Sequence, residues 1–417
     1  MSEQCKTKAL FVISDTPYDT LDIENIERGL VPLSGTHSSF LLVTHYLSSQ
    51  NGLEIGLFIL SGKKIKSERI LSFQSLEEAI SWKEQGQLIL CTADDERALN
   101  KVSAFGNSFF LWLHVHLNHR LISQLESKLF SKLICVSDTV RLTGLHSHKS
   151  NDLMRIYNPL NPHFINYDKS DDFSRETKSL VFSGFIGENK GVHHLLLLWP
   201  KIKEHDNEFK LYIAGSGKLY DSNAKLGSLG IASSEFENKY LVPLLEHYGS
   251  FENAGIHFLG SLKPCDLKSL YTKCSIGIVN LNQWESTETF CCTGIEMIAS
   301  GLKVVCLDKG ALKETIGIFT LANLISVKDL ANLPEILTLI SKEEVNSVMQ
   351  SKDAELIKER YSLSTVGNEW ARLLRKEETR SEDKWNAPKG KRYYIEKLVS
   401  AFQLSKLYRL TITFLKR

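Results

Sequence analysis

The sequence predicts an α/β protein built from two Rossmann-like domains, each with a doubly wound parallel sheet. Short apolar runs alternate with amphipathic segments in both halves of the chain, which is typical of parallel strands joined by helices. The length of 417 residues exceeds the size at which a single hydrophobic core usually stops growing. Apolar residues make up 42% of the chain and charged residues 24%, as in globular proteins.

Net charge and cysteine content indicate which partners and which cellular compartment to expect. The net charge of +1 gives no overall attraction for nucleic acid, so none is expected as a partner. The eight cysteines form no C-x-x-C pair and several lie in apolar runs, which indicates reduced thiols in a cytoplasmic protein. The first residues lack the apolar core of a signal peptide, and no stretch reaches the roughly 20 apolar residues of a membrane span.

The first half contains apolar runs that we expect to form buried strands, at residues 9–14, 53–60, 88–91, 109–116 and 133–137. Gly35 precedes a helix predicted over residues 38–48, whose apolar face includes Phe40 and Leu41. A glycine at this place lets a ligand approach the backbone amides closely. The simpler interpretation, a plain turn glycine, stays open.

Two histidines stand at the end of the run 109–116. His114 and His116 alternate with apolar neighbours and therefore point to the same face of the strand. His116 lies at the C-terminal end, where open α/β sheets bind their ligands. Histidine can also donate or accept a proton near neutral pH. For either residue the alternative is a histidine whose hydrogen bonds are satisfied inside the core.

The second half repeats the alternation, with strands predicted at 179–185, 209–214, 256–259, 276–279 and 304–307. Gly184, Phe185 and Lys190 lie at the end of the first strand and in the loop after it, and Gly215 and Gly217 follow the second. Lys190 is a point charge able to reach a phosphate. Amides next to the glycines can contact a base or a phosphate. Ordinary surface loops are the alternative for both segments.

The stretch from Glu288 to Gly301 carries the most informative pattern. It predicts a loop and a short helix, with Thr287 or Thr289 as the helix cap and Gly301 in the left-handed position that ends it. Glu288 precedes the helix, and Glu296 follows eight residues later, about one turn inside it. Because a helix start attracts anions, the two carboxylates would flank an anion site. Such a site suits a ligand with a phosphate and several hydroxyls, for example a nucleotide-sugar.

The spacing E-x7-E, followed by A-S-G and an apolar strand, resembles the donor-site signature of retaining GT-B glycosyltransferases of group 1 (glycosyltransferase family 4). The similarity covers about residues 8–375 and is strongest in the second half. It implies two Rossmann-like domains that face a central cleft. An acceptor-side domain is then expected at residues 1–170 and a donor domain at 176–355, with a helix at 356–375 that crosses back to the first domain.

The resemblance also implies the reaction and the residues that carry it. A hexosyl group would move from a UDP-, GDP- or ADP-sugar to a glycan or lipid-linked acceptor, in surface polysaccharide or glycoconjugate synthesis and without a metal or other cofactor. His116, Lys190 and Glu288 are the implied catalytic residues. Glu296 would bind the ribose hydroxyls and Glu288 the hydroxyls of the sugar. The other implied donor-binding residues are Gly35, Gly184, Gly215, Gly217, Thr289, Phe290 and Cys291.

One position departs from the family pattern. Members commonly have Gly-Arg where this chain has Gly184 and Phe185, so the bidentate cation that would help to hold the diphosphate is absent. Another cation, for example Lys263, can replace it. A non-catalytic nucleotide-sugar-binding protein therefore stays open as an alternative function, as does a different GT-B enzyme such as an epimerase or a sugar phosphorylase.

Residues 376–417 are expected to lie beyond the fold, as a polar linker and a basic tail. From Lys389 onward, eight Lys or Arg side chains stand against Glu396 alone. Apolar residues at helical spacing between the basic positions of 391–417 predict an amphipathic helix that can lie on an anionic membrane. The protein is thus expected to be cytoplasmic, with peripheral attachment to the inner face of the cell membrane as one possibility. A helix packed on the parent protein is the alternative.

Overall fold

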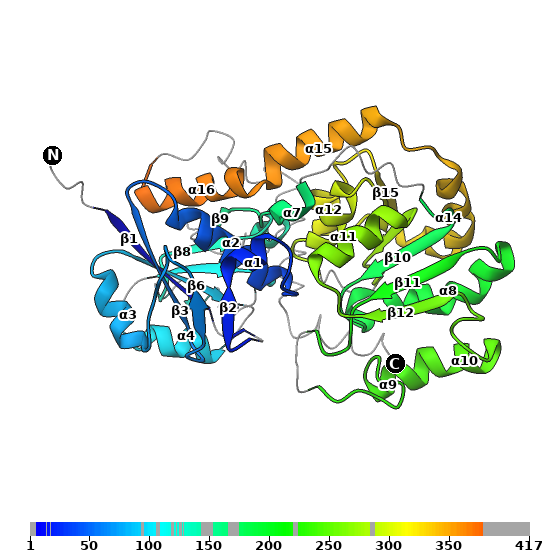
Figure 1. The fold of residues 1–417 in the computed structure, drawn as a ribbon, viewed down its shortest axis with the longest axis horizontal. Coiled ribbons are helices and arrows are strands. Elements are labelled where there is room, and N and C mark those ends of the chain that lie inside the picture. Colours follow the sequence, from blue (N-terminus) through cyan, green and yellow to red (C-terminus); the bar gives the residue numbers. More distant parts are fainter. Residues whose placement is uncertain are drawn as a thin grey trace. The chain divides into compact units, whose positions relative to one another are not determined.

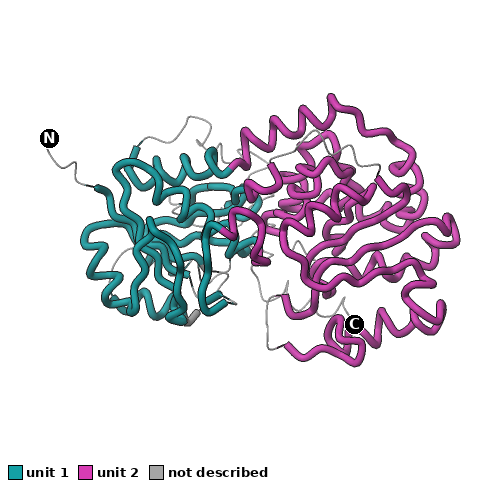
Figure 2. Tube along the Cα trace, viewed as in Figure 1, with its two compact units in different colours: residues 1–24, 35–159, 363–417 teal, residues 25–34, 160–362 magenta. Residues whose placement is uncertain are grey.

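The computed structural model describes residues 6–13, 15, 16, 18–92, 96–105, 109–117, 121, 123, 124, 127, 129–142, 153–165, 175–219, 224–283 and 288–377. The chain forms two compact units (Figure 2). Unit 1 comprises the described residues of 1–24, 35–159 and 363–417, and unit 2 those of 25–34 and 160–362. The predicted basic segment 391–417 lies outside the described residues.

Unit 1 contains a seven-stranded parallel sheet in the order β5-β3-β1-β6-β7-β8-β9 (Figure 1). Because β1 lies inside the sheet with later strands on both sides, the unit is doubly wound, as the sequence predicted. A small parallel pair, β2 (Thr20–Asp22) and β4 (Lys64–Lys66), lies apart from it. The strands of the main sheet are β1 (Thr7–Ile13), β3 (Leu53–Ile59), β5 (Leu71–Ser72), β6 (Gln87–Thr92), β7 (Phe110–Leu113), β8 (Lys132–Cys135) and β9 (Leu153–Arg155).

Aromatic side chains form the centre of unit 1. The Phe11 ring of β1 lies 5.8 Å from Phe40 and 5.9 Å from Trp370, between ring centroids. Trp112 of β7 lies 4.6 Å from Trp370, and all four residues are buried. Contacts of this kind stabilise a core beyond simple area burial. Residues far apart in the sequence therefore share one core, with α2 (Gly35–Ser48) and α16 (Leu363–Arg375) side by side on the sheet.

Unit 2 contains a six-stranded parallel sheet in the order β12-β11-β10-β13-β14-β15. Its two central strands are β10 and β13, each buried along nearly its whole length, as a sheet covered on both faces requires. The strands are β10 (Ser179–Ser183), β11 (Lys210–Ala214), β12 (Ile256–Gly260), β13 (Ile276–Val279), β14 (Lys303–Leu307) and β15 (Ala322–Ile325).

The helices follow the strands in both units. Besides α2, the described helices that begin in residues 1–159 are α1 (Ile23–Glu27), α3 (Leu76–Lys83), α4 (Glu96–Ser103) and α6 (Asp138–Leu142). Unit 2 has the helices α7 (Pro162–Ile165), α8 (Val192–His205), α9 (Ser234–Phe236), α10 (Val242–Tyr248), α11 (Pro264–Lys273), α12 (Cys292–Ala299), α13 (Ala311–Thr315), α14 (Leu333–Lys342) and α15 (Ser347–Tyr361). The described part of unit 2 also contains the 3-10 helices η2 (Glu188–Lys190) and η4 (Val327–Asn332) and the π-helix η3 (Glu237–Leu241).

Two predicted boundaries in unit 1 are wrong. The strand predicted to reach His116 ends at Leu113, so both histidines lie beyond it. The helix predicted from residue 38 begins at Gly35 itself. Both errors concern element ends, where local patterns are weakest.

The segment 25–34 packs in unit 2 although its neighbours in sequence belong to unit 1. The Ile26 carbonyl accepts a hydrogen bond from Asn161 Nδ2 at 2.9 Å. The Gly29 carbonyl accepts one from the Cys265 amide at 3.1 Å. These buried polar contacts over long sequence separations explain the placement, because backbone groups removed from water need partners.

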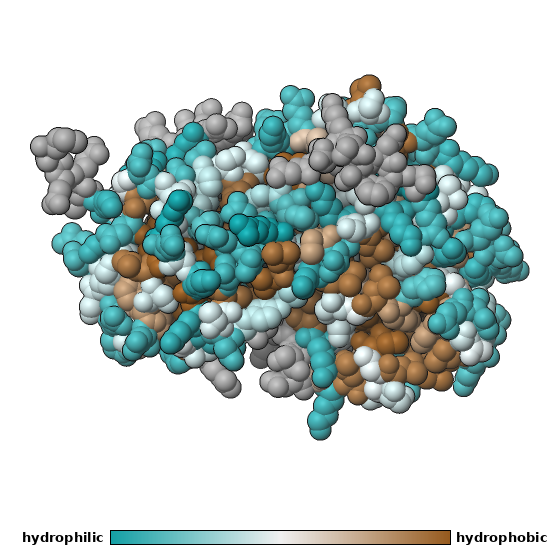
Figure 3. Space-filling view, viewed as in Figure 1, coloured by the Kyte–Doolittle hydropathy of each residue, from teal (hydrophilic) through white to brown (hydrophobic). Residues whose placement is uncertain are grey.

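The surfaces of both units mix polar and apolar residues. On the face shown in Figure 3, polar residues predominate, while apolar residues gather toward the lower part of unit 2. Among the described residues, Leu197 on α8 and Leu259 on β12 are large apolar side chains that are exposed. No described helix has both the length and the apolar character needed to cross a bilayer.

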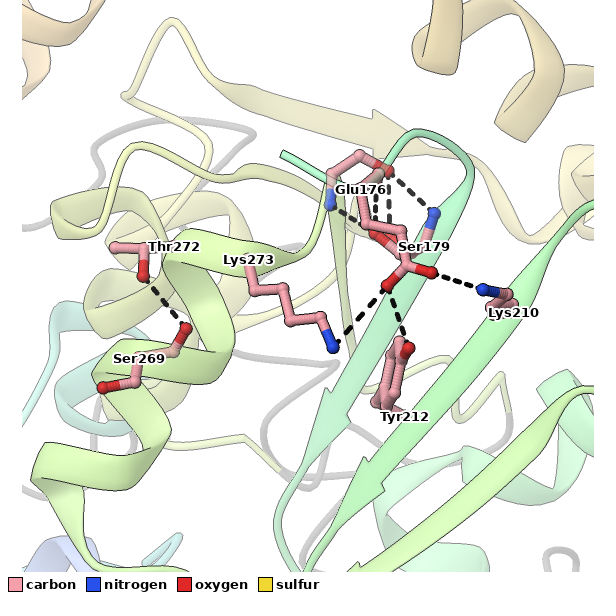
Figure 4. Close-up of polar contacts among 8 residues, drawn as sticks. Glu176, Ser179, Lys210, Tyr212, Ser269, Thr272 and Lys273 are labelled. Carbon is pink, nitrogen blue, oxygen red and sulfur yellow. Dashed lines mark hydrogen bonds and ion pairs between the residues drawn. The ribbon is translucent and has the colours of Figure 1, made fainter. Parts of the chain in front are cut away.

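The N-terminal edge of the sheet in unit 2 is closed by a structural ion cluster (Figure 4). The Glu176 carboxylate accepts hydrogen bonds from Lys210 Nζ at 2.5 Å and the Tyr212 hydroxyl at 2.9 Å, and Lys273 Nζ lies 3.9 Å away. The hydrogen bond from Lys210 is the main cause that lowers the pKa of Glu176. Burial and the bond to Glu176 raise the pKa of Tyr212 to about 12. These contacts join the start of β10 to β11 and α11.

Arg175 connects the C-terminal ends of two helices at the same edge. One guanidinium nitrogen, Nη1, donates to the carbonyls of Tyr271 at 2.7 Å and Cys274 at 2.8 Å, at the end of α11. The other, Nη2, donates to the Ser300 carbonyl at 2.7 Å, at the end of α12. Helix C-termini leave carbonyls without internal partners and carry partial negative charge, so a cation there is favourable. Arg175 therefore holds α11 and α12 together.

Arg175→Met should lower the free energy of unfolding by about 2–3 kcal/mol, because charge-assisted hydrogen bonds to three helix-end carbonyls are lost. Arg360→Met, at an exposed position of α15, is the matched control and should change it little. Urea unfolding of both variants followed by circular dichroism measures the difference. Equal stability of the two variants would contradict the assigned role of Arg175.

Gly367→Ala should destabilise unit 1. An added Cβ would lie 2.1 Å from Cδ1 of Tyr46, so the contact between α16 and α2 must open, at a cost of about 1–3 kcal/mol. In an unconstrained helix the same change is favourable, which makes the sign diagnostic. Thermal unfolding should show a smaller loss for Gly367→Ala in a Tyr46→Ala background. The same loss in both backgrounds would mean that the Tyr46 ring is not the obstacle.

Candidate functional site

The candidate site lies at the carboxyl ends of β10, β13 and β14. These three strands are neighbours in the sheet, so the loops that follow them meet at one edge. Open parallel sheets bind ligands at this edge. The loops contain Gly184 to Gly191 after β10, Asn280 to Gln283 and then Glu288 after β13, and Asp308 to Gly310 after β14.

A partly buried ion pair joins the first two loops. Lys190 Nζ lies 2.6 Å from Glu288 Oε1, and Asn280 Nδ2 donates to the same oxygen at 3.0 Å. Glu288 is 7% exposed, so these partners replace most of the water around its carboxylate. A carboxylate removed from water is costly unless it is paired and hydrogen-bonded. The structure thus brings together two of the three predicted catalytic residues.

Asn280 and Asn282, which the sequence analysis did not single out, hold the loop after β13 in shape. Asn280 has a φ of 27°, in the left-handed region that asparagine tolerates better than most residues. Its Oδ1 accepts a hydrogen bond from the Asn282 amide at 3.0 Å. Asn282 Nδ2 in turn donates to the Asn189 carbonyl at 3.4 Å. The available signal was the pair of asparagines directly after a buried strand.

The helix α12 begins at Cys292, with Cys291 in the cap position. The prediction of a threonine cap is therefore wrong for Thr289, which lies two residues earlier, and Thr287 falls outside the described residues. Burial raises the pKa of the Cys291 thiol, so Cys291 is a neutral side chain at this helix start. Gly301 has a φ of 74° and follows the helix, as predicted.

Phe290, one of the predicted donor-binding residues, packs into the core. Its ring meets Tyr361 edge-on, with centroids 5.5 Å apart, and the residue is buried. Any contact of Phe290 with a ligand would therefore come from its backbone.

Glu296 lies on α12 in a setting that disfavours its charge. Although the residue retains some exposed surface, burial of the carboxyl raises the pKa of Glu296 to about 7. Tyr271 of α11 is fully buried nearby, and burial followed by the Glu296 charge raises the pKa of Tyr271. A carboxyl that titrates near neutral pH is common at binding and catalytic sites.

Two glycines allow the loops to approach one another. A Cβ on Gly215, whose φ is 149°, would lie 1.8 Å from the Gly184 carbonyl oxygen. A Cβ on Gly191 would lie 2.2 Å from the Asn282 amide nitrogen. Only glycine therefore fits where the β10 loop meets its two neighbours. Gly184 and Gly217 lie in the same pair of loops.

The long segment between β11 and β12 contacts the loop after β10 that carries Lys190. Glu188, two residues before Lys190, accepts hydrogen bonds from the Tyr240 hydroxyl at 2.5 Å and from Lys239 Nζ at 2.9 Å. The bond from Tyr240 is the main cause that lowers the pKa of Glu188. The buried Glu237 accepts three backbone amides of this segment, those of Leu229, Ile231 and Ala232.

Gly35 and His116 belong to unit 1, whereas the other candidates belong to unit 2. His116 is half-buried after β7, and His114 is buried. His114 Nδ1 lies 3.5 Å from Asn158 Nδ2, and burial, followed by the nearby His37, lowers the pKa of His114 to about 3. His114 is therefore neutral at physiological pH. Its burial fits the alternative of a core histidine.

The described residues contain no group of three or more His, Cys, Asp or Glu side chains placed to hold a metal ion. The cations at the site are instead lysines, Lys190 and, after β14, Lys309. Lys263, the predicted substitute for the missing arginine, is exposed and precedes α11, beyond β12.

Comparison with known proteins finds a sequence match in the second half of the chain and a structural match over most of its length. Residues 165–358 match the sequence model of the family described as glycosyl transferases group 1. An uncharacterized glycosyltransferase of Methanocaldococcus jannaschii is 29% identical over 171 residues, which are 39% of this chain. The chain matches about a third of that relative, 37% of its length.

Solved structures share the two-sheet architecture. A glycosyltransferase from Rickettsia africae has a TM-score of 0.62 and 16% identity, over 89% of this chain and 98% of that one. Anabaena HepE in complex with UDP has a TM-score of 0.58 and 15% identity, over 89% and 100%. HepE has also been solved with UDP-glucose, with a TM-score of 0.57 and 14% identity, over 88% and 99%. The chain therefore has the GT-B fold, and its residues 165–358 are similar in sequence to the glycosyl transferases of group 1.

Proposed function

We propose that the protein is a retaining glycosyltransferase that moves a hexosyl group from a nucleotide-diphosphate sugar to a glycan or a lipid-linked acceptor. The observation that carries the proposal is the partly buried Lys190–Glu288 pair at the carboxyl edge of the sheet, near the start of α12. A cation and a carboxylate at hydrogen-bond distance suit a ligand that has phosphate next to sugar hydroxyls. The match to group 1 glycosyl transferases over residues 165–358 supports it.

The proposed donor contacts follow the resemblance to group 1 glycosyltransferases, and the residues concerned lie in unit 2 in the loops at the carboxyl edge or on α12. Lys190 and the first amides of α12 face the diphosphate, Glu288 binds hydroxyls of the transferred sugar, and Glu296 those of the ribose. Amides near Thr289, Gly184, Gly215 and Gly217 complete the donor site. HepE is a protein of the same fold that was solved with UDP and with UDP-glucose, so a uridine nucleotide is the first donor to test here.

Catalysis in this proposal is mainly electrostatic. Breaking the bond between the sugar and the phosphate builds negative charge on the departing diphosphate, which prearranged cations and amides stabilise. The acceptor attacks from the face that the diphosphate leaves, and the proton of its hydroxyl passes to a diphosphate oxygen. His116 is the proposed catalytic residue that reaches the transferred sugar, and the amides near Gly35 are a proposed contact to the donor diphosphate. No metal is part of the mechanism.

A second candidate function is a GT-B protein that binds nucleotide-sugars without transferring the sugar, or that acts as an epimerase. Phe185 is the observation that favours it, because the ring stands where a basic side chain would strengthen the hold on the diphosphate. We also propose that the protein acts in the cytoplasm in surface polysaccharide or glycoconjugate synthesis, with residues 391–417 as a peripheral contact to anionic membrane.

The wild-type protein should release free nucleotide slowly from at least one member of a panel of UDP-, GDP- and ADP-sugars, because water replaces the acceptor. Chromatography of the nucleotide products, beginning with UDP-glucose, measures this reaction. Binding of a sugar nucleotide without turnover across the whole panel would support the second candidate function instead.

Lys190→Met should reduce turnover by about 100-fold or more, as loss of one prearranged charge at a transition state does. Lys201→Met, on the exposed face of α8, is the matched control and should retain full activity. Circular dichroism should show that both variants are folded. A folded Lys190→Met protein with normal turnover would exclude Lys190 from the reaction.

Glu296→Gln should remove a pH dependence near neutrality. The pKa of about 7 lies above the value of 4.5 for a solvated glutamate, so the folded protein loses stability as pH rises from about 4.5 to about 7. The glutamine variant avoids this loss and should be more stable than wild type at pH 8, by up to about 3 kcal/mol, and similar at pH 4.5. Urea unfolding at the two pH values tests the sign.

The same variant tests the proposed ribose contact. An ionised carboxylate accepts from two hydroxyls, so affinity for UDP should rise with pH through about 7 in the wild type and stay flat in Glu296→Gln. Calorimetric titration from pH 6 to pH 8 measures both profiles. Parallel profiles for the two proteins would remove Glu296 from the nucleotide site.

A further inference from the structure

The sheet order of unit 2 places the loop after β13 between two others. β13 pairs with β10 on one side and with β14 on the other, all parallel. The loops after β10 and β14 therefore flank the β13 loop at the carboxyl edge. Each of these flanking loops carries a lysine, Lys190 after β10 and Lys309 after β14.

Both lysines reach the β13 loop. Lys190 Nζ is 2.6 Å from Glu288 Oε1 at one end of the loop. Lys309 Nζ donates to the Gln283 carbonyl at 2.9 Å, near the other end. Lys309 is half-buried, so its ammonium is directed along the protein surface toward this loop and does not extend into bulk water.

Charge balance at the edge calls for a second cation. Lys190 and Glu288 form a pair without net charge, whereas a nucleoside diphosphate brings at least two negative charges. Phe185 supplies none. Lys313 is 70% exposed and pairs with Asp308 at 3.2 Å, so it extends into solvent next to an acidic residue. Lys263 follows β12, which lies three strands away from β13.

We propose that Lys309 is the second cation for the diphosphate of the donor, on the side of the site opposite Lys190. The inference rests on the proposed function. An ammonium has three N–H donors, so one group can hold the Gln283 carbonyl and also bind a phosphate oxygen. Lys309 then performs the charge neutralisation that a basic residue at position 185 would provide, from the other neighbour of β13.

A series of substitutions at Lys309 distinguishes the effect of its charge from the effect of its hydrogen bond to the Gln283 carbonyl. Lys309→Gln keeps an N–H donor for the Gln283 carbonyl and removes the charge, and Lys309→Met removes both. Lys313→Met is the matched control, because Lys313 lies four residues after Lys309 and is exposed on α13. The probes are UDP, UMP and uridine, with GDP and ADP as alternatives, titrated calorimetrically into the full-length protein.

Both Lys309 variants should lose affinity for UDP by about 10- to 100-fold, as loss of a charge-assisted hydrogen bond implies. They should bind uridine like the wild type, and the salt dependence of UDP binding should become weaker. Lys313→Met should match the wild type throughout.

Wild-type affinity of Lys309→Gln for UDP would overturn the inference, because the lysine would then only support the loop. Equal losses for UDP and for uridine in both variants would overturn it as well, since a distorted site and not a missing charge would be the cause. Failure of the wild type to bind any of the nucleoside diphosphates would remove the proposed function itself, and the inference with it.

Discussion

The carboxyl edge of the sheet in unit 2 depends on one partly buried ion pair, between the ammonium of Lys190 and the carboxylate of Glu288. Glu288 is almost inaccessible to water, and a carboxylate in such a place is tolerated only with charged and hydrogen-bonding partners. Lys190 and Asn280 are those partners. Since they come from the loops after β10 and β13, the pair also sets the positions of both loops relative to the start of α12. Removing the Lys190 charge would leave the buried carboxylate of Glu288 without its cation.

The charged residues at the two edges of this sheet have different surroundings. At the N-terminal edge, Arg175 and Glu176 are surrounded by partners within the protein, and these contacts join strands to helix ends. At the carboxyl edge, the charged groups stand in loops that meet without intervening side chains, because glycine occupies the closest approaches. Arg175 holds the C-terminal ends of α11 and α12, and α12 begins at the functional edge. By fixing the C-terminal end of α12, Arg175 therefore also helps to hold the start of this helix at the candidate site.

Much of the arrangement follows from local patterns. The segment from Glu288 to Leu307 was predicted as loop, helix and strand, and α12, Gly301 in the left-handed conformation and β14 are found there. Parallel sheets in both halves are also confirmed. The threonine cap was wrong because cap preference is weak beside the packing of Phe290 and Cys291 into the core. The strand that was extended to His116 ends three residues earlier, since an alternating pattern does not show where pairing with a neighbour stops.

What the sequence determined by itself is the set of elements, because hydrophobic period and glycine position act over a few residues and need no distant partner. The order of strands, the pairing of Lys190 with a glutamate 98 positions later and the passage of residues 25–34 into unit 2 were decided only by the tertiary structure. The same holds for the contacts of Asn280, Tyr240 and Lys309, which join residues distant in the sequence or loops that follow different strands. Long-range contacts depend on which surfaces bury one another best, and that choice is made by the whole core at once.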